Sequence, residues 1–129
     1  MSAIKTEYGR DWAVDRILHG DDYPELQYVL IGSGDSDPVE SDTELDIEEY
    51  KASVEDTNSN IYKVGDLPGT YRVDITVSGG VEVDADTSIS EFGIETAEQN
   101  LVYREVRDPT VISSGERISF EIEVELVNV

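Results

Sequence analysis

Apolar and polar residues alternate most clearly near the end of the chain, over residues 118–126. A period of two places successive side chains on opposite faces of a strand, so this pattern predicts an antiparallel strand with one buried face and one row of carboxylates in solvent. Residues 71–77 alternate in the same way, and Gly79-Gly80 then predicts a hairpin turn into Val81 and Val83. Shorter apolar segments predict further strands over 89–94 and 101–106.

The first half of the chain predicts a helix followed by strands. Val14, Ile17 and Leu18 have helical spacing, with Trp12 and Ala13 beside them, and Gly20 then offers a C-terminal stop just after His19. A helix this short needs tertiary contacts, so we expect its apolar face to dock on the rest of the protein.

Three more segments complete the pattern. The apolar residues 26–31 predict a strand covered on both sides, by the sheet and by the helix. A further strand is expected over 50–54, and residues 56–60 have the composition of a turn.

Together these elements predict a mainly β fold. We expect a single domain over residues 1–129, in which a helix within 1–20 packs on an antiparallel β-sandwich formed by 26–129. The strand spacing also suits a jelly-roll-like form of the sandwich, and a small barrel is the alternative.

The net charge of the chain indicates the salt concentration in which the protein works. Thirty acidic residues against nine basic ones give a formal net charge of −21, and only three of the nine are lysines. Self-repulsion at this density destabilises a compact state in dilute buffer, and salt screens it. The composition is typical of proteins from salt-in halophilic archaea, although an acidic mesophilic protein or one with a basic partner would also fit.

The same charge argues against nucleic-acid and membrane partners, because phosphate backbones and anionic lipids would be repelled. The apolar segments are shorter than a membrane span of about 20 residues, and the first ten residues lack the apolar core of a signal peptide. The absence of cysteine excludes disulfides and thiolate chemistry.

Candidate chemistry is sparse. His19 is the only histidine, so one chain cannot build a Ser-His-Asp triad or a multi-histidine metal site, and we expect no enzyme activity and no cofactor. Paired carboxylates could in principle perform glycosidase-type acid–base chemistry. In a chain with thirty acidic residues, however, such pairs are expected by chance and do not indicate an active site. Gly32-Ser33-Gly34 lacks the Lys and Ser/Thr of a P-loop, so it predicts a turn.

Two weaker candidate groups remain. Clustered carboxylates could bind a hard cation, although their spacing is not that of an EF-hand and loosely bound Na⁺, K⁺, Mg²⁺ or Ca²⁺ is the simpler expectation. These are Asp35, Asp37, Asp42 and Asp46. Large amphipathic side chains suit interfaces but equally suit ordinary packing under a sheet. The interface candidates are Trp12, Ile17, Tyr28, Tyr50 and Tyr103.

With the elements in order, a family resemblance emerges. The segment from Gly9-Arg10 to Gly20, the strand and turn over 28–34, and Asp42-Thr43-Glu44-Leu45 resemble the opening of tailed-phage structural proteins of the tail-fibre and tail-collar type. The segments 89–94 and 100–104, Pro109 and the last strand follow in that family's order, so the resemblance spans residues 9–126. The chain departs from the family at Ile94-Glu95, where Leu-Phe is usual, and at Asp35-Ser36-Asp37, where uncharged Thr is common.

The resemblance implies a structural subunit of a tailed-virus virion from a halophilic host, assembled in the host cytoplasm. Its partners would be copies of itself and other virion proteins, at the tail, baseplate or fibre. The alternatives are a capsid decoration or turret protein, and a module that binds a host cell-surface receptor or glycan.

Overall fold

The computed structural model describes residues 2–22, 24–65 and 69–125. Within these ranges the chain forms one α-helix, one short 3-10 helix and eight strands. In chain order they are β1 Ser2–Lys5, α1 Glu7–His19, η1 Gly20–Asp22, β2 Leu26–Gly32, β3 Glu48–Ser53, β4 Ser59–Lys63, β5 Thr70–Ser78, β6 Thr87–Thr96, β7 Leu101–Ile112 and β8 Arg117–Glu125.

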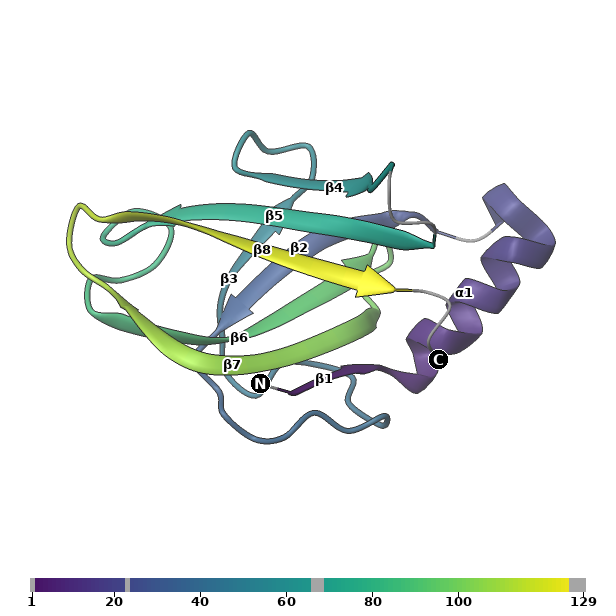
Figure 1. Ribbon diagram of the computed structural model, residues 1–129, viewed down its shortest axis with the longest axis horizontal. Helices are drawn as coiled ribbons and strands as arrows, with labels where there is room; N and C mark the ends of the chain where they lie inside the picture. Colours follow the sequence, from purple (N-terminus) through teal and green to yellow (C-terminus); the bar gives the residue numbers. More distant parts are fainter. Residues whose placement is uncertain (1, 23, 66–68, 126–129) are drawn as a thin grey trace.

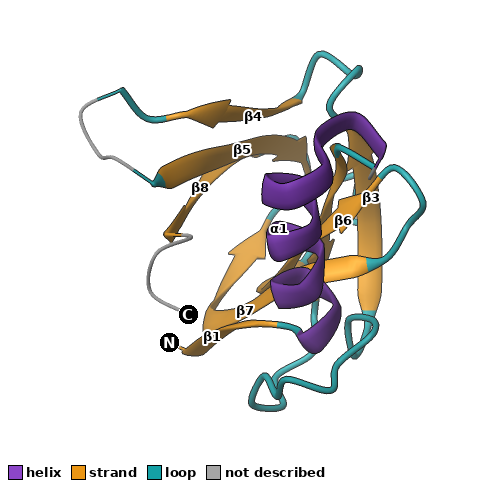
Figure 2. Ribbon diagram, turned by 90° about the vertical axis from the view of Figure 1, so that its right-hand side faces the viewer, coloured by secondary structure: helices purple, strands orange, loops and turns teal. Residues whose placement is uncertain are grey.

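The strands form two antiparallel sheets that face each other. One sheet has five strands in the order β1-β7-β6-β2-β3, and the other has three in the order β4-β5-β8. Figure 1 shows the two layers with α1 at one end, and Figure 2, viewed from that end, shows the helix lying across it. The predicted class, an N-terminal helix packed on an antiparallel β-sandwich, is therefore confirmed.

The core lies between the inner faces of the sheets. Both layers contribute side chains with essentially no exposure, such as Ile31 and Phe92 from one sheet and Val73 and Ile122 from the other. The rings of Phe92 and Phe120 meet across the layers, with centroids 5.0 Å apart. Burial of this apolar surface is the main force that holds the two sheets together.

Strand predictions based on alternation agree with the structure. In β8 the apolar residues from Phe120 to Val124 are buried, and the glutamates between them are exposed. Leu126, the last residue of that predicted strand, lies outside the described residues. The strands predicted over 71–77, 89–94 and 101–106 are longer than expected, and the one predicted over 50–54 begins earlier, at Glu48.

The predicted hairpin after Gly79-Gly80 is wrong. Residues 80–82 form a turn, Val81 is 78% exposed, and Val83 makes only an isolated bridge with Gly79. Strand β5 pairs instead with β4 and β8. The glycines do allow a sharp turn, since Gly80 has φ 85°, but the next segment crosses to the other sheet.

Two short strands had no clear signal in the sequence. β1 occupies the residues before the helix and pairs with β7 about a hundred positions later, with Ala3 opposite Glu105. β4 pairs with β5, with Ile61 opposite Val73. Each has only four or five residues, which is too few for a period of two to stand out.

The helix docks through Gly9, which the pattern did not single out, and Trp12, which the pattern placed beside the apolar face. Its buried residue is Gly9, and Trp12 packs against the core, whereas Val14, Ile17 and Leu18 are 55%, 81% and 68% exposed. The expectation that the latter three would dock on the sheet is therefore wrong. Gly9 contacts β7 so closely that a Cβ would lie 2.1 Å from the Val102 carbonyl oxygen. The orientation of α1 is therefore determined by direct contact between its backbone at Gly9 and the backbone of β7, with no side chain between them.

Thr6 holds the start of α1 on β7. Its side chain accepts a hydrogen bond from the Gly9 amide at 2.9 Å, which caps the helix, and donates one to the Leu101 carbonyl at 2.5 Å. The Thr6 amide also donates to the Val102 carbonyl at 3.1 Å. At the other end, Gly20 has φ 56° and its amide bonds to the Arg16 carbonyl, so the predicted glycine stop is confirmed. No described helix is long and apolar enough to cross a membrane.

Substituting Gly9→Ala should destabilise the protein although alanine favours a helix. We expect a loss of about 1–3 kcal/mol, the usual cost of forcing extra volume into a closely packed contact. The measurement is urea-induced unfolding at constant high salt. Gly65→Ala is the matched control, because nothing lies within 4 Å of its added Cβ. Equal stability of the two variants would show that α1 does not depend on this close approach.

Candidate functional site

The most connected polar group in the structure is Arg104, on β7. Its side chain is only 1% exposed. Its Nε donates to Glu91 Oε2 on β6 at 2.9 Å, and its Nη1 donates to Asp42 Oδ2 at 2.9 Å. Its Nη2 lies 3.1 Å from Asp46 Oδ2 and donates to the Ser36 carbonyl at 3.0 Å. One buried guanidinium therefore joins the five-stranded sheet to the acidic loop over residues 33–47.

Glu91 holds the same loop from beneath. This carboxylate is fully buried and accepts hydrogen bonds from the amides of Gly34 at 3.1 Å, Asp46 at 2.6 Å and Ile47 at 3.2 Å. A Cβ at Gly32 or Gly34 would lie 2.6 Å from Glu91 Oε1. The two glycines are therefore needed for close approach to a carboxylate, and neither has a positive φ.

Loop 33–47 also covers the outer face of the sheet. A Cβ at Gly93 would lie 2.9 Å from Leu45 Cδ2 and 3.0 Å from Leu101 Cδ1, with Leu30 close by. These leucine side chains leave no room for a side chain at position 93. The expectation that the helix would cover the outer side of β2 is wrong here, because Leu45 of the loop packs over Gly93, next to Leu30 of β2.

The candidate cation ligands are divided by this arrangement. Asp42 and Asp46 pair with Arg104, whereas Asp35 and Asp37 are exposed. A hydrogen bond from the Ser36 side chain, with help from Arg104, holds the Asp46 pKa below its usual value. Among the described residues, no group of three or more His, Cys, Asp or Glu side chains is placed to hold a metal ion.

The network therefore does structural work. Burial alone would lower the Arg104 pKa, but hydrogen bonds to Glu91 and Asp42, with the charges of Glu91 and Asp46, outweigh it and raise the pKa. A paired and hydrogen-bonded charge can remain buried, whereas an isolated one is very costly. The donors of Arg104 and the acceptors of Glu91 point at each other and at the loop backbone, which fixes the loop's shape.

Three of the aromatic interface candidates lie inside the chain. Trp12 packs at the edge of the core, and its Nε1 donates to the Pro24 carbonyl at 2.6 Å. Tyr50 also packs on the core and accepts a hydrogen bond from Asn58 Nδ2 at 3.1 Å. Tyr103 is buried and donates to Glu105 Oε1 at 2.8 Å. Desolvation and the neighbouring Glu105 charge raise the Tyr103 pKa far above its usual value.

The other two candidates are more accessible. Tyr28 is half-buried, and the Lys51 ammonium lies 5.3 Å from its ring centroid. Ile17 is the most exposed of the large apolar residues that the structure describes, and with Val14 and Leu18 it forms one stripe on the solvent side of α1. We call Val14, Ile17 and Leu18 the α1 stripe. Contiguous exposed apolar groups on a strongly charged surface are typical of a contact site.

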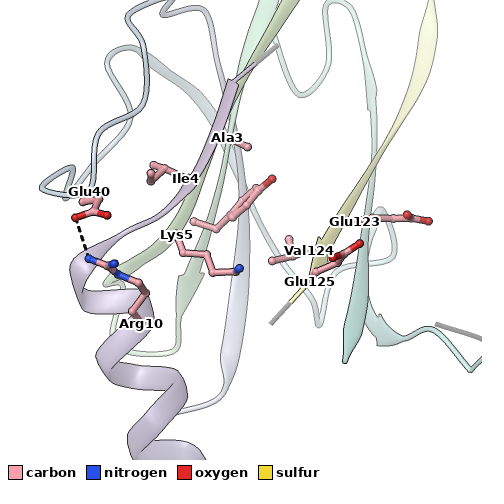
Figure 3. Close-up of a pocket in the computed structure, with 9 residues that line it drawn as sticks. Ala3, Ile4, Lys5, Arg10, Glu40, Glu123, Val124 and Glu125 are labelled. Atoms are coloured by element: carbon pink, nitrogen blue, oxygen red, sulfur yellow. Dashed lines mark ion pairs between the residues drawn. The ribbon is translucent and has the colours of Figure 1, made fainter. Parts of the chain in front are cut away.

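A pocket opens between β1, the start of α1 and β8 (Figure 3). Its volume is about 290 Å³. Burial lowers the Lys5 pKa, and the nearby Glu125 charge opposes this shift. Strand β8 ends here at Glu125, and the four residues that follow lie outside the described part of the chain. The lining residues are Ala3, Ile4, Lys5, Arg10, Glu40, Tyr103, Glu123, Val124 and Glu125.

The fold and these surfaces define the class as a small, highly acidic β-sandwich domain with a terminal helix. Comparison with protein-family models, curated proteins and solved structures found no match to the chain. The resemblance to tail-fibre and tail-collar proteins accordingly stays a prediction from the ordered motifs.

Proposed function

We propose that this chain is a structural subunit of a tailed-virus particle from a halophilic host, and that it assembles as a homo-oligomer at the tail, baseplate or fibre. The observation that carries the assembly part is the α1 stripe, in which three large apolar side chains are more than half exposed on one helix. Their cover would come from another subunit. The ordered motifs over residues 9–126 support the particle type.

The interior network suits such a role. A subunit of a particle needs a fixed surface, and Arg104 and Glu91 hold the long acidic loop against the sheet at several points. The exposed carboxylates, such as those of β8, keep the exterior hydrated in brine. Both features favour a rigid, soluble building block.

The glycan- or receptor-binding alternative has less support. It would rest on exposed aromatic rings grouped around a loop, and Tyr50 and Tyr103 instead pack within the chain. A capsid decoration or turret protein would use the same kind of assembly surface. Only its location in the particle would distinguish it from a tail, baseplate or fibre subunit.

We expect the chain to form a discrete oligomer in about 2–3 M KCl, a range in which repulsion between copies is strongly screened. Sedimentation equilibrium and light scattering should give a mass that is a whole-number multiple of 14.3 kDa. A monomer at every protein and salt concentration tested would contradict the assembly proposal.

Immunogold labelling of virions that carry the protein should mark the tail, and labelling spread over the capsid would favour the decoration protein instead.

A further inference from the structure

The α1 stripe has a defined place on the helix. Val14 and Leu18 are four residues apart and lie on the side opposite Gly9, which packs on β7. Ile17 lies beside them. The surface beside Val14 is open, with Glu7, Arg10 and Asp11 around it, which leaves room for a side chain of a neighbouring molecule.

The charge of α1 makes a second copy of this chain a suitable partner. The helix carries three acidic and two arginine side chains, a formal charge of −1, whereas the whole chain carries −21. The charge per residue of α1 is about half the average for the chain, so two copies repel each other less there than over an average part of the surface. The stripe is therefore apolar and also lies where repulsion between copies is below average.

The two flanks of the stripe carry opposite charges. Helical spacing places Arg10 on the same flank as Ile17, and Asp15 on the other flank. If the α1 helices of adjacent copies run parallel, the Arg10 flank of one faces the Asp15 flank of the next, as in the pairing of residues five apart in parallel coiled coils. An antiparallel arrangement would place Asp15 near Asp15 of the second copy.

Arg10 is positioned for this contact. Its Nη2 is held 2.9 Å from Glu40 Oε2, and its side chain is still 37% exposed. Since a guanidinium has five N–H donors, Arg10 can keep its ion pair with Glu40 and also donate to a second carboxylate. Glu7 and Asp11 precede the stripe on the outward side, so neighbouring helices would approach at Val14 and Leu18 and diverge toward their N-termini.

We propose that α1 of one copy packs parallel to α1 of the next around a rotational axis, with Val14, Ile17 and Leu18 buried between them and Arg10 of one copy paired with Asp15 of its neighbour. This inference rests on the proposed function, because it names the surface and symmetry of that assembly.

The test measures self-association of charge-reversed variants in about 1 M KCl, where charges are partly screened. Asp15→Arg should raise the dissociation constant about threefold to tenfold, because an attractive pair becomes repulsive. The double variant Arg10→Asp/Asp15→Arg should restore association. The control Asp84→Arg makes the same charge change on an exposed residue in the β5–β6 connection, at the end of the sandwich away from α1 (Figure 1). It should leave association unchanged or strengthened.

A third variant separates the possible failures. Leu18→Ser should weaken association about tenfold or more, with an unchanged unfolding midpoint for the monomer. If Leu18→Ser weakens association but Asp15→Arg does not, the parallel arrangement is wrong. If neither variant has an effect on a chain that does assemble, α1 is not the contact and the proposed function stands. A chain that stays monomeric overturns both proposals.

Discussion

Replacing Arg104 by methionine should lower the free energy of unfolding by about 3–5 kcal/mol, the usual result of removing one partner from a buried ion pair. Methionine keeps much of the volume but no charge. Glu91, fully buried, would lose its cation, and Asp42 and Asp46 would lose theirs. Urea-induced unfolding in about 2–3 M KCl is the appropriate measurement, because guanidinium would itself change the ionic strength.

Arg72→Met is the matched control. Arg72 also contacts two carboxylates, Glu121 at 3.3 Å and Glu123 at 2.5 Å, but all three side chains face solvent on the three-stranded sheet. Exposed ion pairs contribute little to stability, so this substitution should barely move the unfolding midpoint. If both variants lose the same free energy of unfolding, burial of Arg104 does not explain its contribution to stability.

The loss in Arg104→Met should be concentrated in loop 33–47. Hydrogen exchange at the Gly34, Asp46 and Ile47 amides, which donate to Glu91, should accelerate more than exchange in β5. Adding Glu91→Leu should fail to restore stability, because those three amides would then be buried without acceptors. Recovery in the double variant would show that Glu91 is retained only to neutralise Arg104.

The second large effect should come from salt. We expect the thermal unfolding midpoint to rise steeply between about 0.1 M and 1 M KCl, as the Debye length falls from about 10 Å to 3 Å. The cause is the formal charge of −21, which repels itself in the compact state. Thermal scans followed by circular dichroism at constant pH would measure the dependence.

A variant with fewer charges tests the cause. Glu55→Gln, Asp84→Asn, Glu98→Gln and Asp108→Asn neutralise four exposed acidic side chains and change the net charge from −21 to −17. This variant should be more stable in dilute buffer and less sensitive to salt. If the two proteins have the same salt dependence, preferential exclusion of salt, and not charge screening, would be the stabilising effect. A midpoint that does not move with salt would contradict the halophile interpretation.

The candidate site could be predicted only in fragments. The sequence shows an acidic loop that contains Asp42 and Asp46, and it predicts a turn at Gly32 and Gly34. It offers the two glycines as residues that end a strand and the two aspartates as cation ligands. Their partner Arg104 lies more than fifty residues further along the chain, and nothing in the sequence joins them. A possible signal was Glu91 within the otherwise apolar or small segment 89–94, since a charge in a buried strand requires a partner.

The exposed stripe on α1 is a similar case. Helical spacing correctly grouped Val14, Ile17 and Leu18 on one side of a helix, and the choice of docking face was wrong. The pattern of apolar side chains does not indicate the role of Gly9, because this residue allows close packing on β7 by having no side chain. The face that docks depends on Thr6 and Gly9 meeting the backbone of β7, almost a hundred residues away.

Features that depend on neighbouring residues along the chain could be predicted from the sequence. Alternation in β5 and β8, the helix stop at Gly20 and the excess of carboxylates on the surface all follow from periodicity and composition, which are local or additive. The tertiary structure alone decided which charges are buried, which face of α1 is exposed, and how β1 and β4 pair. These depend on contacts between distant segments, whose free energy exists only once the two sheets have come together.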